Sequence, residues 1–98
     1  MPFTVIIEPS AVKDLKEIRV FDRRRIVQAI DEQLIHQPNV RTRNRKMLEG
    51  VPASFSDELL LWEMRVGDFR VLYVVEEEIV SVRRILTKPP HHTTDQIR

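Results

Sequence analysis

The sequence predicts an α+β fold in which a two-helix hairpin packs on a small, mainly antiparallel sheet, in the order β-α-α-β-β-β. A β-branched run bounded by prolines opens the chain, and two stretches with apolar residues at helical spacing follow it. Three strand-like runs separated by short polar turns then fill residues 59–86, and strands joined by short turns must be antiparallel. The 98 residues are expected to form a single domain, 1–98.

The composition is that of a globular protein without disulfide bonds. The chain is 42% hydrophobic and 32% charged, which is typical of a globular domain and not of a disordered one. It has no cysteine, which excludes a disulfide framework and favours a reducing compartment. The first residues show no signal-peptide pattern, and no apolar run approaches the roughly 18 residues of a transmembrane helix. A cytoplasmic protein is therefore expected.

The first half of the chain predicts one strand and two helices. Phe3 to Glu8 reads as a strand that Pro9 ends, because proline cannot donate to a ladder. Ser10 is a candidate N-cap for a helix from about Ala11 to Arg19. A second helix follows after a short link. It carries a stripe of four apolar residues, Ile26, Val27, Ile30 and Leu34, with Asp22 as a candidate cap and an end near His36 or Gln37, before Pro38.

Residues 59–86 predict the main part of the sheet. The strands are Leu59–Val66, Phe69–Val75 and Ile79–Leu86, and a tight turn at Gly67–Asp68 joins the first two. The middle strand is apolar on both faces except at Arg70, which indicates a central strand. Residues 38–56 show little periodicity and are expected to be a loop, and the tail from residue 87 is expected to be irregular or to form a short helix.

Clustered basic residues indicate a polyanionic partner. Eight basic and three acidic residues lie between positions 19 and 46, although the whole chain has a net charge of only +1. No aromatic residue interrupts the basic part of the 38–56 loop, so phosphate contact is a better use of it than base stacking. The alternative is a set of solvated charges. The residues expected to contact RNA phosphates are Arg41, Arg43, Arg45, Lys46 and Lys88.

Cations beside the Gly67–Asp68 turn suggest chemistry on RNA. Cleavage by transesterification needs a base for the 2′-hydroxyl, an acid for the leaving oxygen and cations on the phosphate. Arg65 and Arg70 flank the turn and could both reach one phosphate. Glu63 lies on the Arg65 face and could be the base; the alternative is that it simply pairs with Arg65 or Arg70. Arg84, among apolar neighbours, requires an anionic partner from the protein or from a ligand.

The histidines offer a second kind of proton carrier. His91 and His92 are the imidazoles nearest that end of the sheet, and histidine titrates near neutrality. The alternative is an exposed tail without a role, while His36 is better explained by the dipole at the end of a helix. Because there is no cysteine and there are only three histidines and two glycines, neither a zinc site nor a glycine-rich phosphate loop is expected. No cofactor is expected either.

The run LWEMRVGDFRVLYVVEEEIVSVRRI, residues 61–85, resembles the RelE/ParE superfamily of toxins from type II toxin–antitoxin systems. The upstream segment Lys46–Gly50 and the first helix, with Ala11, Lys13, Asp14 and Leu15, also match that pattern. The resemblance covers about residues 3–88. It implies a RelE-like fold and an mRNA interferase, which is a metal-independent endoribonuclease that cleaves mRNA on the ribosome and inhibits translation.

The resemblance also assigns roles to residues. Arg70 matches the arginine of the family's tyrosine-arginine-valine strand, and Arg65 matches the arginine before the turn. Leu61 and Glu63 stand where some members carry lysines, and no C-terminal arginine or tyrosine follows Lys88. The proton carriers are therefore assigned from position alone, to Glu63 or to His91 and His92.

The resemblance leaves the target open and predicts a partner. A non-catalytic ParE-like toxin that inhibits DNA gyrase is the alternative, because the lysines and the C-terminal tyrosine are missing. A third reading is a degenerate member that only binds protein. In each case the implied partner is a small, acidic antitoxin that covers an exposed sheet edge and an apolar helical groove with an added strand and a helix.

Overall fold

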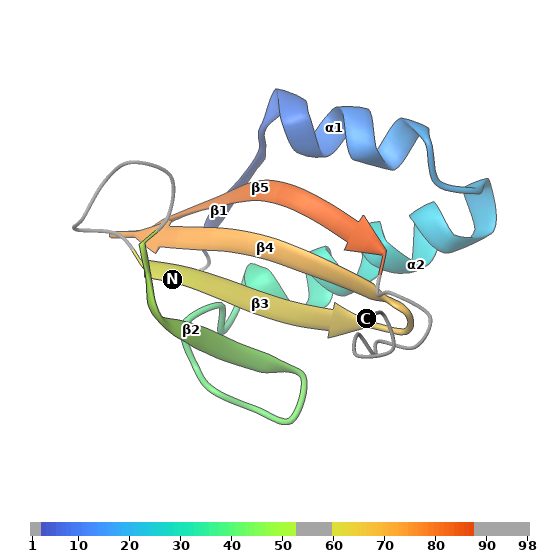
Figure 1. Cartoon of the computed structure of the whole chain (residues 1–98). Helices are drawn as coiled ribbons and strands as arrows, with labels where there is room; N and C mark the ends of the chain where they lie inside the picture. The colour runs from blue at the N-terminus through green and yellow to red at the C-terminus, as the bar shows by residue number, and fades with distance from the viewer. Residues whose placement is uncertain (1–2, 53–59, 88–98) are drawn as a thin grey trace.

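The computed structural model describes residues 3–52 and 60–87, and it shows a five-stranded sheet with helices packed against it (Figure 1). The elements are β1 (Thr4–Ile7), α1 (Pro9–Lys16), α2 (Val20–Ala29), the π-helical turn η1 (Ile30–Leu34), β2 (Arg45–Pro52), β3 (Leu60–Val66), β4 (Phe69–Glu76) and β5 (Ile79–Thr87).

The sheet has the order β1-β5-β4-β3-β2. Neighbouring strands from β2 to β5 are antiparallel, and β1 pairs with β5 in parallel. The prediction of a mainly antiparallel sheet is confirmed, and β4 is its central strand as the apolar pattern indicated. The first and last strands of the described chain therefore lie side by side.

The two helices begin earlier than predicted. Pro9 occupies the first position of α1, where its fixed φ suits a helix and its missing N–H is not needed. Ser10 is not the N-cap, and its Oγ donates instead to the carbonyl oxygen of Arg83, at 2.6 Å. α2 begins at Val20, so Val20 and Phe21 lie inside the helix, where Phe21 is 66% exposed.

The core lies between the helices and one face of the sheet. The predicted alternation is confirmed, because Met64 of β3 is buried on this face and Glu63 lies on the other. The buried residues come from every layer: Ala11, Leu15, Ile26, Ile30, Leu34, Met64, Val66, Val71, Tyr73, Val80, Val82 and Ile85. The opposite face of the sheet carries charged side chains, among them Glu63, Arg65 and Arg70.

One strand was missed by the sequence prediction. Part of the expected 38–56 loop forms β2, an edge strand whose Lys46 lies opposite Glu63 and whose Met47 lies opposite Trp62. The register shifts between Leu48 and Pro52, so β2 is irregular. An irregular edge strand does not need the strict alternation by which strands are recognised in a sequence.

A side chain of α2 lies over the turn between β3 and β4. Gly67 has φ +59°, a conformation that favours glycine. A Cβ at this position would lie 2.7 Å from a guanidinium nitrogen of Arg25, so the α2 side chain covers the turn closely. The positive φ acts against any larger residue at this position, whereas the flexible end of the Arg25 side chain could move aside.

Tyr73 anchors the segment that leads into β2. Its side chain is buried, and burial raises its pKa far above the ordinary value. Its hydroxyl donates to the carbonyl oxygen of Pro38, which is also buried, and its ring stacks on Trp62 with 6.2 Å between centroids.

We expect Tyr73→Phe to lower the free energy of unfolding by about 1–3 kcal/mol, because the buried Pro38 carbonyl loses its donor. Urea unfolding followed by circular dichroism measures this change. An unchanged midpoint would mean that another donor replaces the hydroxyl.

Candidate functional site

A row of side chains crosses the face of the sheet that is opposite the core. Strand register places Lys46 of β2, Glu63 of β3, Leu72 of β4 and Arg84 of β5 in line. Side chains at directly opposed positions lie on the same face. We call this surface the open face; four strands contribute to the row, and the side chains from β2, β3 and β5 are charged.

Glu63 lies between two cations. Its Oε2 is 3.1 Å from Nε of Arg70 and its Oε1 is 3.8 Å from Nζ of Lys46. The side chains of Glu63 and Arg70 are only 17% and 15% exposed, whereas Lys46 is 57% exposed. Poor access of water strengthens the Glu63–Arg70 attraction. The alternative considered for Glu63, pairing with a neighbouring arginine, is thus found, and the partner is Arg70.

Arg65 and Arg70 lie directly opposite each other on β3 and β4. Arg65 is exposed, while Arg70 is nearly covered and bound to Glu63. Two like charges at opposed positions repel, and the Glu63 carboxylate offsets that repulsion. The structure thus brings together four of the predicted site residues: Lys46, Glu63, Arg65 and Arg70.

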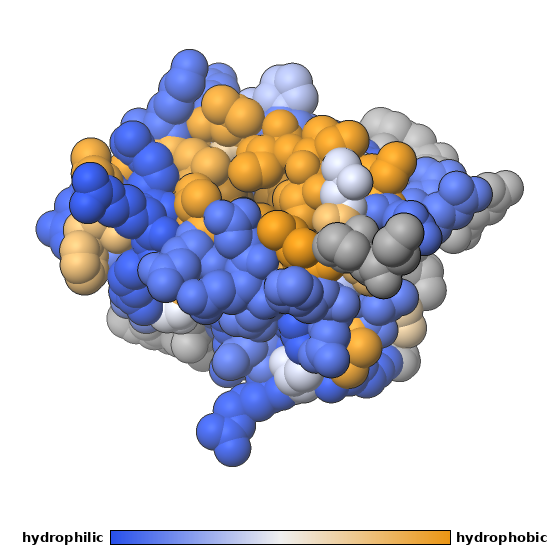
Figure 2. Space-filling model, turned by 180° about the vertical axis from the view of Figure 1, so that it is seen from behind, coloured by the Kyte–Doolittle hydropathy of each residue, from blue (hydrophilic) through white to orange (hydrophobic). Residues whose placement is uncertain are grey.

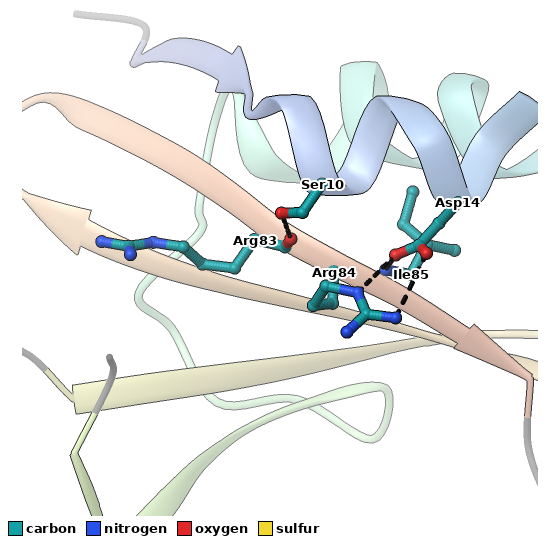
Figure 3. A network of polar contacts seen from close by, with 5 residues as sticks. All are labelled: Ser10, Asp14, Arg83, Arg84 and Ile85. Atoms are coloured by element: carbon teal, nitrogen blue, oxygen red, sulfur yellow. Dashed lines mark hydrogen bonds and ion pairs between the residues drawn. The ribbon is translucent and has the colours of Figure 1, made fainter. Parts of the chain in front are cut away.

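Arg84 has its anionic partner inside the protein. Its Nε donates to Oδ2 of Asp14 at 2.7 Å, and its Nη2 donates to Oδ1 at 3.2 Å (Figure 3). The same Oδ2 accepts the backbone N–H of Ile85 at 2.9 Å. Desolvation raises the pKa of Asp14, but the bonds from Arg84 and Ile85 outweigh it and hold the pKa below its usual value. The bond to Asp14 also raises the pKa of Arg84.

A bulge in β5 leaves Arg83 without an opposed residue on β4, between Val82 and Arg84. The β4–β5 register shifts between Leu72 and Tyr73, so β5 holds one extra residue there. Nε of Arg83 is buried and lies 3.4 Å from Oε2 of Glu8, although the two atoms are not aligned as a hydrogen bond.

Glu8, Asp14 and Arg83 were not among the predicted site residues. No local pattern in the sequence points to them, because their contacts depend on how α1 lies along β5.

The basic residues of the predicted loop separate into two groups. Arg41 and Arg43 are exposed, as a phosphate contact requires. Arg45 is only 5% exposed, and its Nη1 lies 3.4 Å from the carbonyl oxygen of Gln33, so its placement in an exposed basic loop is wrong. Its strand position turns the side chain toward η1 and the core. Lys88, His91 and His92 lie outside the described residues.

Residues 3–52 and 60–87 contain no cluster of three or more histidine, aspartate or glutamate side chains that could hold a metal ion. In the same ranges, no helix is both long enough and apolar enough to cross a membrane.

The helical side of the molecule exposes apolar surface. Figure 2 shows apolar side chains gathered over a broad area of the face seen from behind. A groove of about 440 Å³ lies where β1 meets α1 and is lined by Ile7, Pro9, Val12, Lys13 and Lys16. Phe21 and Val27 of α2 add further exposed apolar side chains.

Solved structures with a similar fold are toxins of the RelE kind. A chain of the archaeal RelE–RelB complex from Pyrococcus horikoshii has 26% sequence identity to this chain and a TM-score of 0.70. The match covers 90% of this chain and 97% of that chain. The RelBE2 toxin–antitoxin complex of Mycobacterium tuberculosis is 21% identical with a TM-score of 0.69, covering 90% and 100%. A double mutant of Escherichia coli RelE in the free state is 17% identical with a TM-score of 0.64, covering 89% and 84%.

The fold is therefore that of a small toxin of the RelE/ParE superfamily, as the resemblance implied. The chain belongs to the family described as the ParE toxin of the type II toxin–antitoxin system parDE, whose model matches residues 5–88. A comparison with the sequences of curated proteins found no match.

The Asp14 contacts predict how stability changes with acid. Because the pKa of Asp14 is lowered on folding, its contribution is present above the unfolded value of about 4 and is lost as the pH falls through the folded value. We expect Asp14→Asn to be less stable than the wild type at pH 7 and the gap to shrink below about pH 4.

Urea midpoints at pH 7, 5 and 3 measure the gap, and Asp31→Asn, an exposed aspartate on η1, serves as the control. A gap of constant size from pH 7 to pH 3 would contradict the assignment to the Asp14 carboxylate.

Proposed function

We propose that this toxin is an endoribonuclease that cleaves mRNA, on the ribosome, at the open face of the sheet. The observation that supports this most is the position of Glu63, a poorly exposed carboxylate held between Arg70 and Lys46 beside Arg65. A base and several cations within one small area are the groups that RNA transesterification needs. The RelE-like fold agrees with such a role.

The proposed reaction assigns a task to each group. A phosphate of the RNA takes the place of the Glu63 carboxylate on Arg70, with Arg65 and Lys46 binding its other oxygens. The released carboxylate accepts the proton of the 2′-hydroxyl, and the 2′-oxygen attacks phosphorus. A 2′,3′-cyclic phosphate forms, the 5′-oxygen leaves, and it takes a proton from the acid, for which His91 or His92 is our candidate. All of these groups are protein side chains.

The remaining basic residues would hold the RNA. Arg41 and Arg43 are exposed in the segment that precedes β2, and Lys46 joins that segment to the site. Lys88 follows directly after β5 and is the further candidate. Contacts of this kind bind phosphates without reading sequence, so they would add affinity and not choose the cleavage site.

We also propose that a small acidic antitoxin binds the helical side of this toxin. Two of the solved relatives are toxin–antitoxin complexes. An amphipathic antitoxin helix would place apolar residues on Val12 and Ile7 and acidic residues beside Lys13 and Lys16. The outer edge of β2 ends the sheet and could accept an additional strand.

A second candidate function is non-catalytic inhibition of DNA gyrase. One observation favours it: Arg70 and Arg84 already pair with carboxylates of the protein itself, so these arginines do not need an RNA ligand. A toxin that acts only by binding could keep these pairs intact.

The two functions differ in their response to changes at Glu63 and Arg70. For the ribonuclease, we expect Arg70→Ala and Glu63→Gln each to slow cleavage of a translated mRNA by roughly 100-fold or more, because one loses a phosphate cation and the other loses the base. Primer extension on the mRNA measures this.

Arg24→Ala is the matched control for Arg70→Ala, because it removes the same charge from the exposed surface of α2. If the wild-type toxin leaves the mRNA intact and blocks supercoiling by gyrase, the ribonuclease proposal is wrong and gyrase inhibition is the function.

A further inference from the structure

A hollow of about 300 Å³ lies on the open face, beside the Glu63 site. Leu61 and Leu72 of the central strands supply apolar surface. Charged and polar groups line the rest: Arg83 and Arg84 of β5, with Glu8 and Ser10 at the start of α1. Apolar surface combined with a few fixed polar groups is the usual character of a site for a small organic ligand.

The hollow adjoins the proposed site of cleavage. Leu72 lies directly opposite Glu63 on one side and opposite Arg84 on the other. Neighbouring strands are about 4.8 Å apart, so the hollow begins roughly one strand from Glu63. A nucleotide with its phosphate at Arg70 could therefore place its base in the hollow.

The polar groups of the hollow are held in fixed positions. Two hydrogen bonds to Asp14 fix the plane of the Arg84 guanidinium (Figure 3). Such a plane stacks well on a nucleobase, and the leucines give the base an apolar surface. Glu8 is held 3.4 Å from Nε of Arg83, which keeps its carboxylate beside the hollow.

The carboxylate of Glu8 offers a way to distinguish the bases. An ionised carboxylate only accepts hydrogen bonds, so it prefers an edge with two adjacent N–H donors. Among the four RNA bases, guanine alone presents such a pair, at N1 and at the exocyclic N2. Adenine, cytosine and uracil each place an acceptor beside their donor on that edge.

We propose that this hollow binds the base of the nucleotide next to the cleaved phosphate, and that Glu8 makes guanine the preferred base. This inference rests on the proposed ribonuclease function, and it adds a specificity-determining residue to it. Glu8 binds the base edge, Arg84 stacks on the base, and Leu61 and Leu72 lie beneath it.

The first test compares cleavage next to each of the four bases in one mRNA, by primer extension. We expect the wild type to cleave next to guanine about tenfold to 100-fold more than next to the other bases, and Glu8→Gln to lose most of that ratio. Glu78→Gln is the control, because it removes the same charge from the exposed β4–β5 turn and should keep the ratio.

The second test measures binding without cleavage. Guanosine 5′-monophosphate should shift the methyl NMR signals of Leu61 and Leu72, and adenosine 5′-monophosphate should shift them less. In Leu72→Trp, where the indole fills the hollow, neither nucleotide should shift the remaining Leu61 methyl signals. If the wild type cleaves RNA but shows neither a base preference nor these shifts, this inference is wrong and the ribonuclease function stands. If guanosine 5′-monophosphate binds but no RNA is cleaved, the hollow is a base site and the ribonuclease function is wrong.

Discussion

A carboxylate on α1 completes the sheet where β1 ends. β1 pairs with β5 only from Ile79 to Val82, so the second half of β5 has no strand on that side. Asp14 accepts the N–H of Ile85 and Ser10 donates to the carbonyl of Arg83, so side chains of a helix replace the missing strand. These contacts join α1 to β5 at the bulge, and Asp14 also binds the guanidinium of Arg84.

The same arrangement explains why the open face can carry so many cations. Arg70, Arg83 and Arg84 each lie beside a carboxylate from another element, namely Glu63, Glu8 and Asp14. A poorly solvated arginine without such a partner would be costly. At the proposed site an anionic ligand would have to compete with these carboxylates, which favours a ligand that makes several contacts at once. A polynucleotide meets that requirement better than a single small anion does.

The sequence was sufficient for the elements whose own pattern defines them. The β3–β4 hairpin follows from Gly67 and from the alternation on either side, and the central position of β4 follows from its two apolar faces. β2 could not be recognised, because its pairing with β3 defines it and its register is irregular. The burial of Arg45 follows from that missed strand.

One charged pair of the site could be predicted from the sequence, and another could not. The Glu63–Arg70 pair was one of the predicted alternatives, since both residues belong to one hairpin and alternation places them on one face. The Asp14–Arg84 pair joins residues 70 positions apart, so it depends on how α1 lies along β5. No local pattern determines that packing, and the hollow beside Arg84 could not be foreseen for the same reason.

The pairing of β1 with β5 has a consequence for how the protein is made. β1 must wait for residues 79–82 before it can pair, so a nascent chain cannot complete the sheet until β5 has left the ribosome. Contacts between the two ends of a chain fold slowly, because a long loop must close first. A nascent chain that stops before β5 has no partner for β1. It also lacks Arg83 and Arg84, which contact Glu8 and Asp14. Such a fragment lacks the complete open face, so an activity carried by this face could begin only after β5 has been synthesised.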